Sequence, residues 1–196
     1  MVGRARLRNI RNCLCDVLEK GVEGDVIETG VWQGGSVIYM KGILAAMSST
    51  KKVYVADSFR GLPPPDDRYP ADRGDQHYLQ SELAVQKQTV EDNFRRCDLL
   101  DDSVYFIEGF FEDTLPKANI DKLSLLRLDG DTYSSTIQVL DTLYDKVQTG
   151  GYVIIDDYGL QGCKRAVDDF RNARGIRNAL VNVDGMGCYW QKSKDL

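Results

Sequence analysis

Two patterns of apolar positions alternate along the chain, and together they predict a sheet flanked by helices. Short, continuous apolar runs between turn residues are typical of buried parallel strands. Apolar side chains that recur every three or four residues are typical of helices with one buried face. Strand patterns occupy residues 25–28, 52–56, 104–107, 125–128, 152–155, 179–183 and 188–190. We therefore expect a doubly wound α/β fold with a seven-stranded, mostly parallel sheet.

Helical spacing fills most of the segments between these strands. The N-terminal helix, within residues 1–21, carries an apolar stripe that could form a homodimer face. Gly150-Gly151 is expected to end the helix before the fifth strand, and a turn at 184–187 implies that the final strand runs antiparallel. The chain is long enough for a single domain over residues 1–196. Helices are expected at residues 4–20, 37–47, 81–100, 132–149 and 162–173, with a short helix or turn at 114–120.

Residues 58–80 form the one long stretch without helical or strand periodicity. It holds four of the five prolines and many charges. Loops of this length in a compact domain are usually lids or disordered segments, and we interpret this one as a lid. Arg73 and His77 lie in it. Either side chain could reach a site beneath the closed loop, but a solvated surface role is the interpretation that we favour.

Two consecutive predicted strands end abruptly in acids. Asp129 and Asp131 follow the fourth strand, and Asp156 and Asp157 follow the fifth. A right-handed helical crossover would bring all four carboxylates to the sheet edge where open α/β sheets bind ligands. Such carboxylates repel each other, so either one is protonated or a cation holds them. Oxygen ligands with little His or Cys nearby favour Mg²⁺ or a similar ion, while the alternative is that these acids are helix caps and turn residues.

Three further turns at the same edge suggest a nucleoside-type ligand. The glycine-rich turn at 29–36 would let a ligand approach the backbone and the N–H groups of the next helix. It contains neither a Walker A loop nor a G-x-G-x-x-G fingerprint. Asp57 ends the second strand, where an acid can bind both hydroxyls of a ribose, or it is only a turn acid before Ser58. Residues 109–111 could line an adenine pocket, unless one of the two Phe side chains belongs to the core.

Composition narrows the function further. The net charge is −5 and no basic block is present, so a nucleic-acid surface is not expected. Five cysteines without a Cys-x-x-Cys pair indicate reduced thiols in a cytoplasmic protein, and a single histidine argues against a His-rich zinc site. No apolar run approaches the roughly 20 residues of a membrane span, and the N-terminus does not resemble a signal peptide.

Four motifs, in order along the chain, resemble those of one family. They are GDVIETGVWQGG at residues 24–35, VADSFRGLPP at 55–64, LDGDTY at 128–133 and IDDY at 155–158. These segments look like the motifs of the macrocin O-methyltransferase (TylF/MycF/NovP) family, and the resemblance extends to the terminal GCYW at 187–190. Characterised members carry a longer N-terminal region before the helix that begins near Arg6. The resemblance therefore implies that acceptor specificity is reduced, altered or supplied by residues absent from this chain.

The family resemblance implies S-adenosylmethionine (SAM), a divalent metal such as Mg²⁺, and methylation of a sugar hydroxyl on a natural product. The substrate would be a small-molecule glycoside. By motif, Asp129, Asp156 and Asp157 would bind the metal, and Asp131 would be the general base. SAM contacts are expected from Glu28, Thr29, Gly30, Ser36, Asp57, Ser58, Gly109, Phe110 and Asp129.

Three other functions compete with this interpretation. A catechol or other vicinal diol could replace the sugar, because the metal needs only two neighbouring oxygens. A non-catalytic SAM-binding module is a second alternative, although it has no need of four acids at two strand ends. A nicotinamide enzyme is a more distant one, since it needs no carboxylate-held metal. Transfer of a methyl group to a metal-held oxygen would use the metal well, because a cation lowers the pKa of a hydroxyl and holds it in line.

Overall fold

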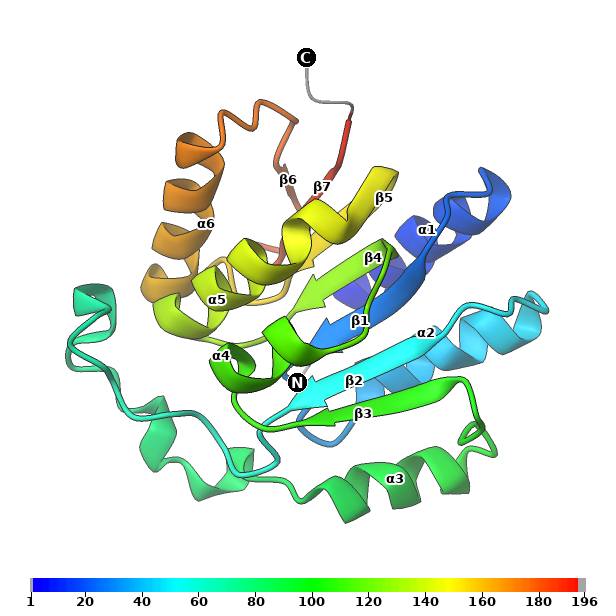
Figure 1. The fold of residues 1–196 in the computed structure, drawn as a ribbon, viewed down its shortest axis with the longest axis horizontal. Coiled ribbons are helices and arrows are strands. Elements are labelled where there is room, and N and C mark those ends of the chain that lie inside the picture. Colours follow the sequence, from blue (N-terminus) through cyan, green and yellow to red (C-terminus); the bar gives the residue numbers. More distant parts are fainter. Residues whose placement is uncertain (1, 194–196) are drawn as a thin grey trace.

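A seven-stranded sheet with helices on both faces forms the body of the computed structural model, which describes residues 2–193 (Figure 1). The strand order is β3-β2-β1-β4-β5-β7-β6. Strands β1 to β5 pair in parallel, and β7 runs antiparallel to both of its neighbours. This arrangement confirms the predicted doubly wound fold with an antiparallel last strand. The strands are β1 Asp25–Thr29, β2 Val53–Asp57, β3 Val104–Glu108, β4 Leu123–Leu128, β5 Val147–Ile155, β6 Val181–Asn182 and β7 Cys188–Gln191.

The side chains of each central strand alternate between two separate hydrophobic cores, one on each face of the sheet. Ile27 and Leu126 point to the face covered by α5 and α6, whereas Val26 and Leu125 point to the face covered by α1, α2 and α3. Alternate strand residues must face opposite sides of a sheet, which explains why these strands read as continuous apolar runs. The helices are α1 Arg4–Glu19, α2 Gly35–Ala46, α3 Lys87–Arg96, α4 Phe111–Thr114, α5 Tyr133–Leu143 and α6 Gln161–Ala173.

The chain connectivity reverses direction between β1 and β4. Crossovers from β1 lead outward to β2 and β3, and those from β4 lead outward to β5 on the other side. The loops after β1 and β4 therefore diverge and leave a crevice at their carboxyl ends. This edge carries every strand-end acid that the sequence indicated.

Gly150-Gly151 does not end a helix, which corrects the prediction of a helix over residues 132–149. α5 stops at Leu143, and β5 already begins at Val147. Val147 pairs with Leu123 and Tyr152 with Leu125, so the two glycines lie in a bulge within β5. A Cβ on Gly151 would lie 2.8 Å from Ser124 O, so the close approach of β4 requires glycine. Helical periodicity alone could not separate a helix end from a bulge.

The predicted helix over residues 81–100 is also shorter than expected. Only Lys87–Arg96 is α-helical, and residues Ser81–Leu83 form a 3-10 turn. The Glu82 carbonyl accepts a hydrogen bond from Trp32 Nε1 at 2.9 Å. This segment is therefore fastened to the glycine-rich turn after β1 instead of continuing α3 toward its N-terminus.

Residues 58–86 cross the carboxyl edge of the sheet as an extended arm, drawn in teal in Figure 1. We call this segment the lid. It contains two further 3-10 turns, Pro70–Asp72 and His77–Leu79. The turn at Pro70–Asp72 packs against α5 and α6. Among the described helices, none combines the length and the apolar character needed to cross a membrane.

Candidate active site

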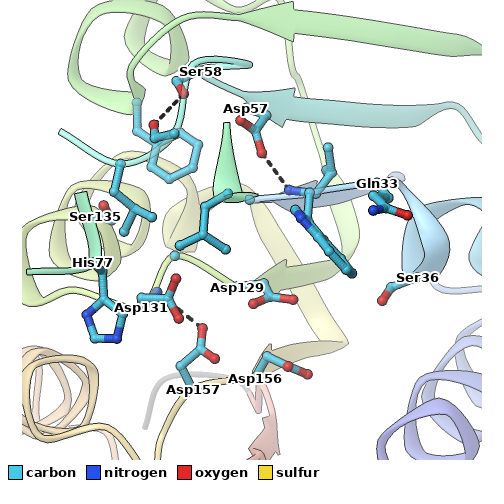
Figure 2. Close-up of a pocket in the computed structure, with 18 of the residues that line it drawn as sticks. Gln33, Ser36, Asp57, Ser58, His77, Asp129, Asp131, Ser135, Asp156 and Asp157 are labelled. Carbon is cyan, nitrogen blue, oxygen red and sulfur yellow. Dashed lines mark hydrogen bonds between the residues drawn. The ribbon is translucent and has the colours of Figure 1, made fainter. Parts of the chain in front are cut away.

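A cavity of about 1290 Å³ opens at the carboxyl ends of the strands. The glycine-rich turn, the end of β2, the turn after β3 and both acid pairs line it (Figure 2). Three residues that were expected to contact the ligand do not line the cavity. Glu28 and Thr29 are buried, and Gly109 donates a hydrogen bond from its N–H to Asp57 O at 2.9 Å. The expected site residues that line the cavity are Gly30, Ser36, Asp57, Ser58, Phe110, Asp129, Asp131, Asp156 and Asp157.

Gly30 lets the ends of β1 and β4 approach closely. Its φ is +82°, and a Cβ at this position would lie 1.8 Å from the carbonyl oxygen of Asp129. Asp129 N in turn donates to Thr29 O at 2.9 Å. The glycine therefore fixes where the first of the metal-ligand candidates leaves the sheet.

Replacing Gly30 with Ala is expected to destabilise the protein more than the same change at Gly21. Both glycines have positive φ, but a Cβ on Gly21 would meet nothing within 4 Å. Gly21→Ala should thus lose only the roughly 1–2 kcal/mol of a left-handed L-residue. Gly30→Ala adds a backbone clash, so its loss of unfolding free energy in urea should be clearly larger. Equal losses in the two variants would contradict the close approach.

The N-terminus of α2 faces the same cavity. Gly35 and Ser36 line it, and the N-cap residue Gly34 supplies no side-chain hydrogen bond to this end of the helix. Gly34 has φ +84° and turns the chain into the helix. Uncapped N–H groups and the positive end of the helix dipole favour a negatively charged ligand group here.

Asp57 supports the glycine-rich turn from the end of β2. Its Oδ2 accepts a hydrogen bond from Val31 N at 2.8 Å, and its Oδ1 accepts one from Phe59 N at 2.7 Å. Burial raises the pKa of Asp57, and these backbone donors oppose the shift. A carboxylate oxygen can accept further bonds, so Asp57 can bind ligand hydroxyls while it holds the turn.

Phe110 and Phe111 divide the two roles that the sequence left open. Phe110 lines the cavity, with the Arg60 guanidinium 5.5 Å from its ring centroid. Phe111 also reaches the cavity wall, but it packs against the core under α5 as well. Of these two side chains, Phe110 is therefore the one with a cavity-lining role alone.

Asp129, Asp156 and Asp157 converge as the sequence predicted. One carboxylate oxygen of each lies within 4.8 Å of those of the other two. Burial, and then the charges of neighbouring acids, raise the pKa of Asp157 well above its usual value. The pKa of Asp156 is also raised, mainly by burial. The raised pKa values of Asp156 and Asp157 indicate that nearby positive charges do not fully compensate the negative charge of this cluster.

Arg127 is one residue of the site that the sequence analysis missed. It is fully buried in β4, and its guanidinium pairs with Glu28, with Asp156 and, at 2.9 Å, with Asp129. Burial alone would lower the pKa of Arg127, but the three carboxyl groups raise it, so the group stays charged. The sequence position of Arg127 could have indicated this contact. Residues i and i+2 of a strand share a face, and Asp129 is two residues after Arg127.

A second arginine reaches the acids from outside the sheet. Arg6, near the start of α1, pairs with Asp156 and also donates from Nε to Asp184 Oδ2 at 3.0 Å. Burial raises the pKa of Glu28 to about 8, against the attraction of Arg127. The two arginines thus offset part of the negative charge of these carboxyl groups, while burial favours the neutral form of Glu28.

Asp131 lies beside this cluster in a left-handed backbone conformation, with φ +57°. Its N–H donates to Asp157 Oδ2 at 3.2 Å. The alternative that Asp131 caps α5 does not hold, because Thr132 is the N-cap residue and accepts from Ser135 N. Burial, followed by the charge of Asp129, raises the pKa of Asp131 to about 6. Its carboxylate therefore faces the cavity with a basicity above that of an ordinary aspartate (Figure 2).

The two lid residues singled out in the sequence differ in their surroundings. His77 lines the cavity near Asp131, in contrast to the solvated role we favoured (Figure 2). Its Nδ1 lies 2.7 Å from Asp75 Oδ2, and this contact raises the pKa of His77. Arg73 is a surface residue, with 70% of its side chain exposed.

Comparison with known proteins identifies the family. The family model described as macrocin-O-methyltransferase (TylF) matches residues 1–192. Demethyldecarbamoylnovobiocin O-methyltransferase of Streptomyces niveus is 49% identical over 99% of this chain and 76% of its own length. The 8-demethyl-8-(2,3-dimethoxy-alpha-L-rhamnosyl)-tetracenomycin-C 4'-O-methyltransferase of Streptomyces olivaceus is 45% identical over 97% of this chain and 74% of its own.

A solved structure agrees with the sequence matches. The O-methyltransferase NovP superimposes with a TM-score of 0.95 at 49% identity, over 98% of this chain and 81% of the NovP chain. The match extends through the strand-end turns that line the cavity, since it covers nearly the whole chain. The chain thus belongs to the macrocin O-methyltransferase family and is a SAM-dependent O-methyltransferase.

Proposed function

We propose that this enzyme methylates a sugar hydroxyl of a glycosylated natural product, with Mg²⁺ held by Asp129, Asp156 and Asp157. The observation that carries the proposal is the convergence of these three carboxylates beside Asp131 in the cavity that the glycine-rich turn also lines. The names of both relatives describe O-methylation of antibiotic-type molecules, and one of them specifies a rhamnosyl group.

The residues around the glycine-rich turn fit SAM. The ribose hydroxyls of SAM would bind Asp57. The carboxylate of SAM would bind at the N-terminus of α2, at Gly35 and Ser36. Phe110 offers its ring face to the adenine. These contacts would leave the opposite end of the cavity, where the acids lie, for the acceptor.

The acid cluster also fits a divalent cation. Three converging oxygen donors are the ligands that Mg²⁺ prefers. Arg127 and Arg6 offset part of the negative charge, and the raised pKa values of Asp156 and Asp157 support a further positive charge at this place. When bound, the cation would lower the pKa of the acceptor hydroxyl and fix its position.

Asp131 is then the group that takes the proton of the acceptor. It lies next to the proposed metal ligands, and its basicity is raised by burial. Arg127 keeps Asp129 and Asp156 oriented from below, so the carboxylates need little rearrangement. The lid, with His77 on its inner side, would exclude water from the reacting groups.

Mass spectrometry of reactions with SAM and a panel of deoxysugar glycosides tests the proposal. Methylated product is expected with Mg²⁺ and should disappear with a chelator. A parallel panel of catechols tests the vicinal-diol alternative. Methylation that is unaffected by chelation would refute the metal assignment, and product from catechols but from no glycoside would refute the sugar acceptor.

Replacing Asp57 with Ala is expected to weaken SAM binding about 10- to 100-fold. Loss of a charge-assisted contact to the ribose costs roughly 1.5–3 kcal/mol, which corresponds to that range. Titration calorimetry measures the affinity. Glu108→Ala is the matched control, since Glu108 also ends a strand at this edge but does not line the cavity. Unchanged affinity in Asp57→Ala would remove Asp57 from the ribose site.

A further inference from the structure

The lid is anchored to the body of the protein through one buried carboxylate. Asp72, in the lid turn Pro70–Asp72, is only 4% exposed. Its Oδ1 accepts a hydrogen bond from Tyr133 N at 2.7 Å, and its Oδ2 accepts one from Ser134 N at 2.8 Å. Both donors belong to the first turn of α5. A residue 61 positions earlier in the chain thus caps this helix.

The body of the protein is shaped to receive this carboxylate. Gly162, at the start of α6, lies against the same point, and a Cβ there would lie 3.1 Å from Tyr133 N and 3.4 Å from Asp72 Oδ1. The ring of Tyr69, also in the lid, packs 6.2 Å from that of Tyr133. Any larger residue at position 162 would crowd the anchor, so the contact is a packed one and not a chance surface pairing.

The anchored turn is directly continuous with Asp131. Tyr133 is two residues after Asp131, whose left-handed conformation is held by the bond from its N–H to Asp157 Oδ2. Thr132 serves only Ser135 N among the first-turn donors. Without Asp72, Tyr133 N and Ser134 N would lose their acceptor, and the turn that presents Asp131 would be less restrained.

The same lid is fastened on the other side of the cavity. Trp32 Nε1 donates to Glu82 O at 2.9 Å, which ties the lid to the glycine-rich turn. Between the two attachments, His77 lines the cavity beside Asp131 (Figure 2), and its Nδ1 pairs with Asp75. Asp72 and Glu82 therefore bracket His77, the lid residue that lies beside Asp131.

We propose that Asp72 is a positioning residue that couples closure of the lid to placement of Asp131. Docking of its carboxylate on the first turn of α5 covers the cavity and restrains the left-handed turn in one step. Release of the carboxylate opens the lid and loosens that turn together. The role of Asp131 in this statement rests on the proposed function, whereas the coupling of the two segments does not.

Hydrogen exchange followed by mass spectrometry tests the coupling in Asp72→Ala. Loss of two bonds to a charged acceptor should speed exchange about 10- to 100-fold in lid residues 66–86 and in residues 131–136 together. Asp67→Ala is the control, because Asp67 lies in the same lid with its side chain fully exposed. Protection in β1 and β4 must stay at the wild-type level, which shows that the fold is intact.

Asp72→Asn and steady-state kinetics separate positioning from simple structural support. An Asn side chain keeps one of the two acceptor oxygens but turns an NH₂ donor toward the other backbone N–H. This variant should therefore recover only part of the protection. In Asp72→Ala, kcat should fall about 10-fold or more while the KM for SAM changes less. Faster exchange in the lid alone, or unchanged kcat in Asp72→Ala, would overturn the proposal. Coupled exchange in a protein that methylates no glycoside would instead refute the proposed function and leave the coupling intact.

Discussion

Asp131→Asn is expected to slow methyl transfer by about 10²–10⁴, the usual contribution of general acid–base catalysis. Asn cannot accept the acceptor's proton, although it matches Asp in shape. Thr132 and Asp72 provide the caps of α5, so the substitution leaves the helix start intact. SAM and metal affinities should therefore remain close to those of the wild type.

Single-turnover kinetics and calorimetry on the same samples check this expectation. The matched control is Asp141→Asn, which changes an exposed acid of the same helix and should leave turnover unchanged. Near-normal turnover in Asp131→Asn, with normal metal binding, would show that another group takes the proton. His77, which also lines the cavity, would then be the next residue to substitute.

The strand ends could be predicted from the sequence because their signals are local. Asp57, Asp129 and Asp156 each follow a short apolar run directly, and in a parallel sheet such runs end at one edge. The convergence of Asp129 with Asp156 and Asp157 then required only the right-handed crossover. The prediction of a carboxylate cluster in the cavity was therefore available without coordinates.

The partners of these acids could not be predicted in the same way. Arg127 contacts Glu28 across 99 positions, and Arg6 contacts Asp156 across 150. The cap that Asp72 places on α5 bridges 61 positions. No periodicity records such contacts, because they depend on how the lid and α1 pack on the finished sheet. The lid was recognisable only as an irregular segment for the same reason.

Asp156→Asn and Asp157→Asn are expected to remove Mg²⁺ binding alike but to differ in their effect on stability. Asp156 pairs with the buried Arg127 and with Arg6. Burial raises the pKa of Asp156, and the two arginines oppose that shift. Because the metal-free Asp156→Asn protein loses both ion pairs, it should gain less stability at pH 8 than Asp157→Asn does. Asp157 has no such arginine partner among the described residues.

Asp157 instead lies against three other acids. Burial and those charges raise its pKa in the folded state above that of the unfolded chain. A carboxyl group shifted in this direction lowers stability at pH values above its unfolded pKa. At pH 8, Asp157→Asn removes that cost, so the metal-free variant should unfold at a higher denaturant concentration than the wild type.

Denaturant unfolding at pH 8, first with a chelator and then with Mg²⁺, separates the two effects. A ligand that binds only the folded state stabilises it by about 2.7 kcal/mol at 100 times its Kd, so Mg²⁺ should shift the midpoint of the wild type upward. Neither variant should respond, whereas the exposed-site control Asp141→Asn should respond like the wild type. A Mg²⁺-dependent shift of normal size in Asp157→Asn would exclude Asp157 from the ligand set. A metal-free Asp156→Asn protein as stable as Asp157→Asn, or more stable, would contradict the role of Arg127, because the loss of a charged partner of a buried guanidinium must offset part of the gain.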